Sequence, residues 1–380
     1  MEFTGDEYPL TLRQDSILTI PILPAELVTE ILSKVRVKPL LRFTCVSKSW
    51  LALISGQEFI KSHLNLSANN KDNTHHRLIL NFGRYLKQWS LKSLLYESVT
   101  EASTLYYPMK IPKRSFRIVG SVNGLICLAD SSKDLVLWNP SIRKYKKLPN
   151  FKTNFWDVSW FVYGFGYDEF RDDYKVVGCF YYDYSSFDVE VGIYSLKSDS
   201  WKSICSLPDG MGFLIELGKF VNGKLHWVNN INDYSYEGCN IISIDLVDEK
   251  WETVEQPSYE EGDIDLQLGL FGSDLSIYIN NEGKHVSVWV MKEYGVRESW
   301  TKMFTIKYAD YSYSYAQPFF MSNKGEVVVA FDETFMIYNP NDDSLTPTGI
   351  HSDGWQYTEI YVKSLVSPFP TDELMIQESD

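Results

Sequence analysis

The chain is poor in cysteine, and its cysteines follow no pattern of a disulfide framework or a zinc site. They are odd in number and widely scattered, at Cys45, Cys127, Cys179, Cys205 and Cys239. No CxxC pair occurs, and the adjacent His75 and His76 have no cysteine neighbours. Disulfide frameworks and zinc sites use closely spaced or even-numbered cysteines. We therefore expect reduced, mostly buried thiols, no metal and no cofactor.

Catalytic motifs and long apolar runs are also missing. No GxSxG, HExxH, P-loop or GxGxxG motif occurs, and the Asp-box-like tetrapeptide at 352–355 stands alone. His226 lies in an apolar strand, where we expect a hydrogen-bonded core residue rather than a ligand. No stretch approaches the ~20 apolar residues of a membrane span. The acidic Glu2, Asp6 and Glu7 precede any apolar run, unlike in a signal peptide. We expect a non-catalytic protein of the cytoplasm, the nucleus or both.

Positive charge is scarce outside one segment. The chain has 36 Lys and Arg against 50 Asp and Glu, a formal net charge of −14. Residues 21–66 are the exception, because they hold six basic and three acidic residues. An acidic body without a basic stripe argues against nucleic acid as the main ligand. The basic segment suits an acidic protein partner, since complementary charge speeds and orients association.

The basic segment has apolar residues at helical spacing. Pro24 stands where a proline starts a helix, because its missing N–H is not needed there. The apolar residues that follow at helical spacing are Leu27, Ile31, Leu32 and Val35. The proline of Val37-Lys38-Pro39 is expected to end this helix, since the residue before a proline avoids the helical region.

Two more helices are expected after this break. A periodic run from Leu40 to Ile54 predicts the second helix, Gly56 ends it, and Phe59–Leu64 predicts a short third. Three short helices cannot bury all the apolar side chains that they carry. The module either binds a partner through that surplus or caps the rest of the chain as an ordinary bundle, and the residues alone leave both open.

From Arg77 onward the sequence repeats pairs of strands. Four units have two apolar or aromatic residues seven positions apart: Trp138 and Tyr145, Tyr194 and Trp201, Ile244 and Trp251, and Tyr338 and Leu345. A fifth, Trp289 and Trp300, has an apparent four-residue insertion. Asn123-Gly124 and Asn222-Gly223 are strong hairpin signals, because both residue types tolerate positive φ. Each unit predicts four strands in roughly 50 residues, the size of a propeller blade.

The repeats predict a β-propeller of about six blades. Five full blades are expected at 116–149, 161–208, 214–257, 266–306 and 316–350. The leftover segments 77–107 and 355–366 would pair as a sixth blade and close the ring, because open sheet edges are a liability. The predicted fold class is therefore α+β multidomain, with three helices before an all-β propeller. A β-sandwich with irregular hairpins is the alternative. The expected units are a tail at 1–20, the helical module at 21–66, a linker at 67–76 and the propeller at 77–380.

The helical module resembles an F-box. The resemblance rests on LPAEL at 23–27, Ile31-Leu32, Val35, LLRF at 40–43 and CVSKSW at 45–50. It implies docking onto the Skp-type adaptor of a cullin–RING ubiquitin ligase. The residues that would contact the adaptor are Leu23, Pro24, Leu27, Ile31, Leu32, Val35, Leu40 and Leu41.

The whole chain is similar to plant F-box proteins with a C-terminal F-box-associated or kelch-like domain, whose relatives include the S-locus F-box proteins. The landmarks are GSVNGL at 120–125, LWNPS at 137–141, and FGYD at 165–168 with DYKVV at 173–177. The resemblance implies a non-catalytic substrate receptor of an SCF-type ubiquitin ligase. Its expected partners are the adaptor, a cullin held through it and a target protein, with no nucleic acid or membrane. Two alternatives stay open: an interaction protein that uses its F-box outside a ligase, and a propeller lectin or glycan enzyme.

The loops of the propeller predict where a target would bind. Antiparallel strands alternate ends, so the loops between a blade's second and third strands and between blades share the face opposite the Asn-Gly turns. Tyrosines are frequent in these loops, and Tyr-rich loops on a rigid scaffold are typical of recognition surfaces. The same rings could instead pack beneath their own loops. The candidate substrate-binding residues are Tyr182, Tyr184, Tyr234, Tyr236, Tyr259, Tyr311 and Tyr313.

Overall fold

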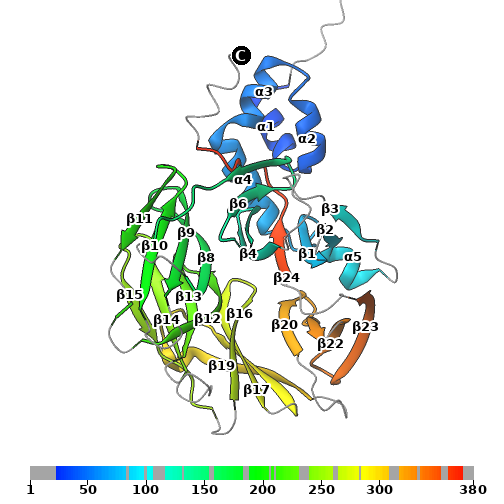
Figure 1. Ribbon diagram of the computed structural model, residues 1–380. Coiled ribbons are helices and arrows are strands. Elements are labelled where there is room, and N and C mark those ends of the chain that lie inside the picture. Colours follow the sequence, from blue (N-terminus) through cyan, green and yellow to red (C-terminus); the bar gives the residue numbers. More distant parts are fainter. Residues whose placement is uncertain are drawn as a thin grey trace, which may run out of the picture.

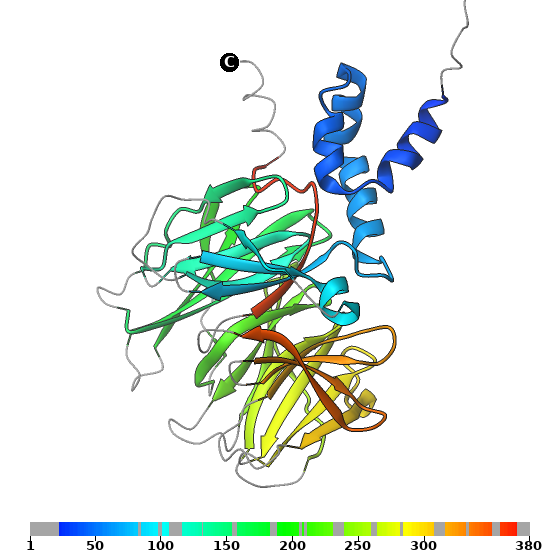
Figure 2. The ribbon, with the colours of Figure 1, turned by 90° about the vertical axis from the view of Figure 1, so that its right-hand side faces the viewer.

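A helical domain stands on one face of a ring of β-sheets (Figures 1 and 2). The structure is a computed structural model, and no helix in its described part is long and apolar enough to cross a membrane. It describes residues 23–82, 85–97, 101–105, 116–130, 132–153, 158–182, 188–204, 207–208, 211–230, 239–259, 264–281, 284–307, 316–331, 334–351 and 358–370.

The helical domain has four helices in the described residues, where three were expected. They are α1 (Ala25–Ser33), α2 (Val37–Phe43), α3 (Lys48–Ser55) and α4 (Gln57–Ala68). The expected second helix is two helices, because the backbone of Ser47 is extended and its hydroxyl accepts the N–H of Trp50, which caps α3. Pro39 lies in the first turn of α2, where its missing N–H is tolerated, so the break precedes Val37. α4 ends two residues inside the expected linker.

In the described parts of the chain, the β-strands form six groups of four, with one short helix, α5 (Leu91–Tyr96), and one 3-10 turn, η1 (Arg297–Ser299), between strands. The first two groups are β24 (Thr358–Val362), β1 (His76–Phe82), β2 (Tyr85–Ser90) and β3 (Ser103–Leu105), then β4 (Phe116–Val122), β5 (Leu125–Asp130), β6 (Leu135–Asn139) and β7 (Lys144–Lys147). The next two are β8 (Trp160–Asp168), β9 (Asp173–Tyr181), β10 (Val189–Ser195) and β11 (Ser200–Ile204), then β12 (Phe213–Val221), β13 (Lys224–Asn230), β14 (Asn240–Asp245) and β15 (Trp251–Val254). The last two are β16 (Ile264–Phe271), β17 (Asp274–Asn281), β18 (His285–Met291) and β19 (Trp300–Lys307), then β20 (Ala316–Met321), β21 (Val327–Phe331), β22 (Thr334–Asn339) and β23 (Ser344–His351).

These groups are the blades of a propeller. Four are separate sheets, and the two that comprise β8–β15 join through one parallel pair, Gly164 with Gly218. A Cβ on either glycine would lie within 2.7 Å of the ring of Trp227, so glycine allows this close approach of inner strands. The ring closes because β1 pairs antiparallel with β24, from His76 opposite Val362 to Leu80 opposite Thr358. The predicted six blades and their closing blade are confirmed.

The seven-residue spacing in the sequence is a cross-strand pairing. Trp138 lies opposite Tyr145, and Tyr194 lies opposite Trp201, because four turn residues join the third and fourth strands of those blades. Ile244 lies opposite Trp251 and Tyr338 opposite Leu345 in the same way. The apparent four-residue insertion between Trp289 and Trp300 lies in the turn, where residues 292–299 join β18 and β19. Trp300 lies opposite Met291, since η1 lengthens the turn and the register shifts beside Trp289.

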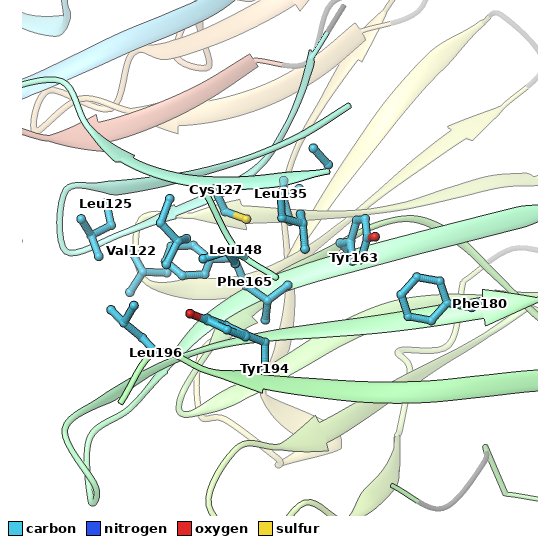
Figure 3. Packing of buried hydrophobic residues seen from close by; sticks show 14 residues of the cluster. Val122, Leu125, Cys127, Leu135, Leu148, Tyr163, Phe165, Phe180, Tyr194 and Leu196 are labelled. Atoms are coloured by element: carbon cyan, nitrogen blue, oxygen red, sulfur yellow. The ribbon is translucent and has the colours of Figure 1, made fainter. Parts of the chain in front are cut away.

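Apolar side chains fill the space between neighbouring blades. Figure 3 shows one such cluster, in which Val122, Leu125 and Cys127 of one blade face Phe165 and Tyr194 of the next. Burial raises the pKa of the Cys127 thiol, and of the Cys179 thiol in the adjoining cluster. Both cysteines are buried as expected, whereas Cys45 is exposed.

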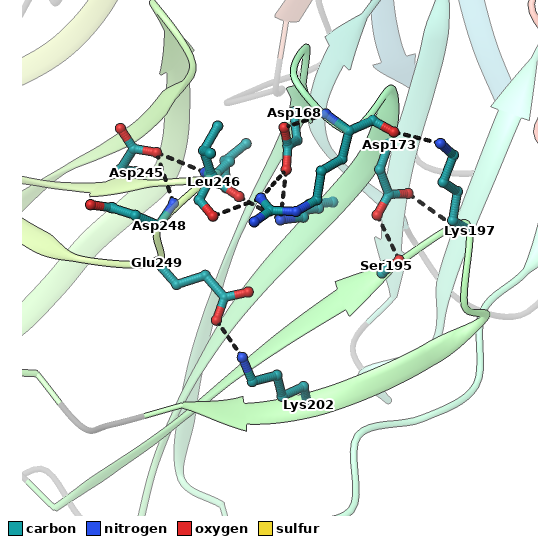
Figure 4. A network of polar contacts seen from close by, with 12 residues as sticks. Asp168, Asp173, Ser195, Lys197, Lys202, Asp245, Leu246, Asp248 and Glu249 are labelled. Atoms are coloured by element: carbon teal, nitrogen blue, oxygen red, sulfur yellow. Dashed lines mark hydrogen bonds and ion pairs between the residues drawn. The ribbon is translucent and has the colours of Figure 1, made fainter.

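The FGYD motif ends in a buried carboxylate, and the two basic residues that bind it also reach the next blade (Figure 4). The buried carboxylate of Asp168 accepts hydrogen bonds from Arg171 at 2.9 Å and lies 3.0 Å from the ammonium of Lys175. Burial alone would raise the pKa of Asp168, but the hydrogen bonds from Arg171 and Lys175 outweigh it and hold this pKa below its ordinary value. Lys175 also donates to the carbonyl of Leu246, and Arg171 to that of Val247 at 2.7 Å, both in the next blade.

The LWNPS motif anchors the segment after the closing strand. The side chain of Asn139 is fully buried, and its Nδ2 lies 3.1 Å from the carbonyl of Ser364, 3.1 Å from its hydroxyl and 2.8 Å from the carbonyl of Val366. Its Oδ1 accepts the N–H of Ser141 at 2.8 Å, which shapes the turn. One amide therefore holds β6 to residues more than 200 positions away.

The same segment belongs to the core of the helical domain. Leu365 packs with Leu32, Val37, Leu40, Ile54 and Phe59, and Ile142 of the β6–β7 turn packs against them. Nε2 of the buried His63 lies 2.8 Å from the carbonyl of Val35, which ties α4 to the end of α1. The helical domain and the propeller thus share apolar contacts.

We expect Asn139→Ala to lower the free energy of unfolding by about 2–3 kcal/mol, because two carbonyls are left buried without a donor. Asn339→Ala is the matched control: Asn339 stands in a second Asn-Pro turn, where its side chain accepts only the N–H of Asn341. Urea unfolding of both variants measures the difference. Equal losses would show that the contacts to Ser364 and Val366 contribute little.

His226 is the hydrogen-bonded core histidine that the sequence predicted. Its Nδ1 lies 3.1 Å from the carbonyl of Lys219, and its Nε2 lies 2.7 Å from the hydroxyl of Tyr294. Burial lowers the pKa of His226 to about 4. Between pH 6.5 and pH 4 the unfolded chain binds a proton at this residue that the folded protein does not bind, so acidification favours unfolding.

We expect His226→Gln to reduce the loss of stability between pH 6.5 and pH 4, by up to about 1.4 kcal/mol per pH unit. The free energy of unfolding, measured by urea titration at several pH values, checks this. His285→Gln replaces a half-buried histidine and is the control. An unchanged pH slope in His226→Gln would contradict the assignment.

Candidate functional site

The outer side of α1 carries a row of apolar side chains that no described element covers. Leu23 is 55%, Leu27 45% and Ile31 55% exposed. Leu27 and Ile31 lie one turn apart on the same side of the helix, and Leu23 precedes Leu27 by four residues. Pro24 and Leu41 are also exposed. These are five of the eight residues that the sequence assigned to adaptor contact.

The other three lie inside the domain. Leu32 is 2% and Leu40 0% exposed, and both pack in the core with Leu365. Val35 is half-buried against the same core. This corrects the expectation for Leu32 and Leu40, because a buried side chain cannot touch a partner's surface. These residues fix the position of α1 instead.

Two exposed apolar residues were missed by sequence reasoning. Val46 follows α2, and Leu51 lies on α3. The periodic run from Leu40 to Ile54 contained both, but it did not show which members face solvent. The surface around them is basic, since Arg36, Lys38, Arg42 and Lys48 are exposed and none forms an ion pair with a carboxylate in the described part of the chain.

The helical domain contacts hairpin turns on one face of the propeller, the turn face. Lys61 of α4 forms an ion pair of 2.7 Å with Asp172 in the β8–β9 turn. The Nδ2 of Asn323 in the β20–β21 turn donates to the carbonyl of Lys71, just after α4. Gly124 of the β4–β5 turn has φ +83°, and a Cβ there would meet Ser364 at 2.3 Å. The hairpin turns thus face the helical domain.

Two of the candidate tyrosines lie in described loops on the opposite face. Tyr182 follows β9, is half-buried, and its N–H donates to the carbonyl of Asp188 across the loop at 3.2 Å. Tyr259 precedes β16, packs against a blade core and donates to Gln256 at 2.7 Å, which matches the alternative that some rings pack beneath their own loops. The remaining candidates lie outside the described residues: Tyr184, Tyr234, Tyr236, Tyr311 and Tyr313.

A cavity of about 610 Å³ lies among the inner strands of the ring, on the side of the helical domain. Lys219 and Glu359 from two inner strands line it, and residues 68–71 and Asn73 lie across its mouth. Burial raises the pKa of Glu359, although Lys219 opposes the shift. Among the described residues, no group of three His, Cys, Asp or Glu side chains could hold a metal.

Comparison with known proteins matches both parts of the chain. Residues 20–62 match the F-box domain, and residues 85–368 match the F-box associated beta propeller domain. The chain is 31% identical over 359 residues to F-box/kelch-repeat protein At3g23880 of Arabidopsis thaliana, which covers 91% of this chain and 96% of that protein. It is 32% identical over 343 residues to F-box protein CPR1 of the same plant, covering 83% and 81%. The chain belongs to the family of F-box proteins with an F-box-associated β-propeller domain.

Proposed function

We propose that the protein is a substrate receptor of an SCF-type ubiquitin ligase. The exposed apolar row Leu23, Leu27 and Ile31, within an F-box, is the observation that carries this proposal. Exposed apolar rows next to basic residues fit a partner with an apolar groove and acidic surroundings. The partner is a Skp-type adaptor, which in turn binds a cullin.

The target protein binds to the loop face on the far side of the ring. The helical domain is attached on the side of the hairpin turns, so the adaptor and the target would occupy opposite ends of the molecule. The receptor does no chemistry itself. It contributes by holding a target lysine near the ubiquitin-conjugating enzyme, because proximity makes the transfer effectively intramolecular.

We expect Leu27→Asp to abolish co-purification of the adaptor, because an ionised carboxylate would replace an apolar contact in the interface. Leu66→Asp is the matched control, since Leu66 is an exposed leucine of α4 that lies beyond the residues matching the F-box domain. Circular dichroism confirms that both variants fold. Unchanged adaptor binding in folded Leu27→Asp would refute the assignment of the row.

The same pull-down separates the ligase from a non-ligase F-box assembly. A ligase receptor brings down a cullin together with the adaptor. An adaptor-bound complex without a cullin, in cells where the cullin is present, would favour the alternative.

Target capture tests the loop face. Interface energy concentrates in a few aromatic anchors, and each costs about 2 kcal/mol, roughly a thirtyfold loss of affinity, when truncated. We expect such a loss from alanine at Tyr182, Tyr184, Tyr234 or Tyr313, with adaptor binding intact. The target protein is first identified by affinity purification of the receptor from cells in which the proteasome is inhibited. Lys224→Ala and Lys324→Ala, beside turns on the other face, are controls, and a larger loss from them would reverse the assignment of faces.

A further inference from the structure

Basic side chains converge where the helical domain meets the closing blade. The backbone N–H of Lys363 donates to the carbonyl of His75 at 3.0 Å, and Arg77 lies opposite Tyr361. Side chains alternate along a strand, so His75, Arg77 and Lys363 point to the same side of this sheet. His76 and Val362 point to the other side, where both line the cavity among the inner strands.

The helical domain adds its own basic groups on that side. The ring of His63 on α4 lies 6.2 Å from the ring of His75, edge to face. Nε2 of His63 lies 2.8 Å from the carbonyl of Val35, the residue before Arg36. Arg36 therefore stands beside the two histidines. We name Arg36, His63, His75, Arg77 and Lys363 the junction cluster.

Among the described residues, the junction cluster has no acidic counterpart. Within the described part of the chain, no ion pair joins Arg36, Arg77 or Lys363 to a carboxylate. The guanidinium of Arg77 instead donates to the carbonyls of Thr74 at 3.0 Å and His76 at 2.7 Å. Nδ1 of His63 is buried without a hydrogen-bond partner. Half-buried like charges are costly unless a counter-charge is present.

The neighbouring positive charges lower the pKa values of two members of the cluster. Burial and then the nearby charges of Arg77, Arg36 and Lys38 lower the pKa of Lys363 to about 8. Burial, followed by the charges of His63 and Arg36, lowers the pKa of His75 to about 4. An anion between these groups would relieve the repulsion.

We propose that the junction cluster binds a small phosphate-bearing anion, held by Arg36, Arg77 and Lys363. A phosphate supplies about two negative charges and several acceptor oxygens, and guanidinium groups bind it through paired hydrogen bonds. Arg36 is exposed and Lys363 half-buried, so a small ligand reaches the site from solvent. The bound anion would join α2 to β1 and to the segment after β24, and so hold the F-box in one orientation on the propeller.

Thermal unfolding of the full chain tests the site with inorganic phosphate and tripolyphosphate as probes, against chloride at equal ionic strength. We expect both phosphates to raise the melting temperature, tripolyphosphate more strongly. Calorimetric titration then gives their affinities. Lys363→Met should lower the affinity for tripolyphosphate at least ~10-fold, since it removes one charge-assisted contact of about 1.5–3 kcal/mol.

Two further readouts separate binding from a general charge effect. Lys302→Met removes an exposed lysine of the outer strand β19 and should leave the affinity unchanged. Without phosphate, Lys363→Met should be at least as stable as the unmodified protein, because it removes repulsion. No phosphate-specific stabilisation, or equal affinities of Lys363→Met and Lys302→Met, would overturn the proposal.

Discussion

The hydrogen bonds from Asn139 to Ser364 and Val366 are the constraint on which the rest of the structure depends. A propeller must close its ring or leave an open sheet edge, and here the last strand, β24, pairs with β1. The segment after β24 is held by Asn139, and its Leu365 enters the core of the F-box. The contacts that secure the ring therefore also position the F-box.

This shared segment explains why the two ends of the molecule can have separate roles. The F-box is fixed to the turn face through Leu365, Lys61 and the chain around Lys71. Its apolar row on α1 stays exposed because Leu32, on the other side of α1, packs in the core. A fixed distance between adaptor and target is what the proposed receptor, acting by proximity, would require. The junction cluster lies in the same interface, where a bound anion would add to this rigidity.

The sequence predicted those features that depend on neighbouring residues. Asn123-Gly124 gave a tight turn because both residues adopt positive φ, and the spacing of Trp138 and Tyr145 followed from pairing across a four-residue turn. Ring closure could also be inferred, since two unpaired segments remained. The spacing of Trp289 and Trp300 indicated an insertion, but the register shift beside Trp289 and the 3-10 turn η1 were not predicted, because no local pattern shows them.

The sequence predicted only in part which apolar residues of the F-box are exposed, and the reason is physical. Leu27, Ile31 and Leu32 are all apolar and follow one helical period, so the sequence did not show which side of α1 faces the core. That choice depends on Leu365, which lies more than 300 residues further along the chain and whose role no local pattern indicates. The structural role of Asn139 could not be predicted for the same reason, because its hydrogen-bond partners are residues of the distant C-terminal segment.

The most direct test of this account is hydrogen exchange of the native protein, measured by mass spectrometry on peptides of α1–α4 and of β4–β7. If the F-box and the first blades are joined by the segment after β24, Asn139→Ala should speed exchange in both regions together. Faster exchange in β4–β7 alone, with α1–α4 unchanged, would show that the F-box is an independent unit and would contradict the account.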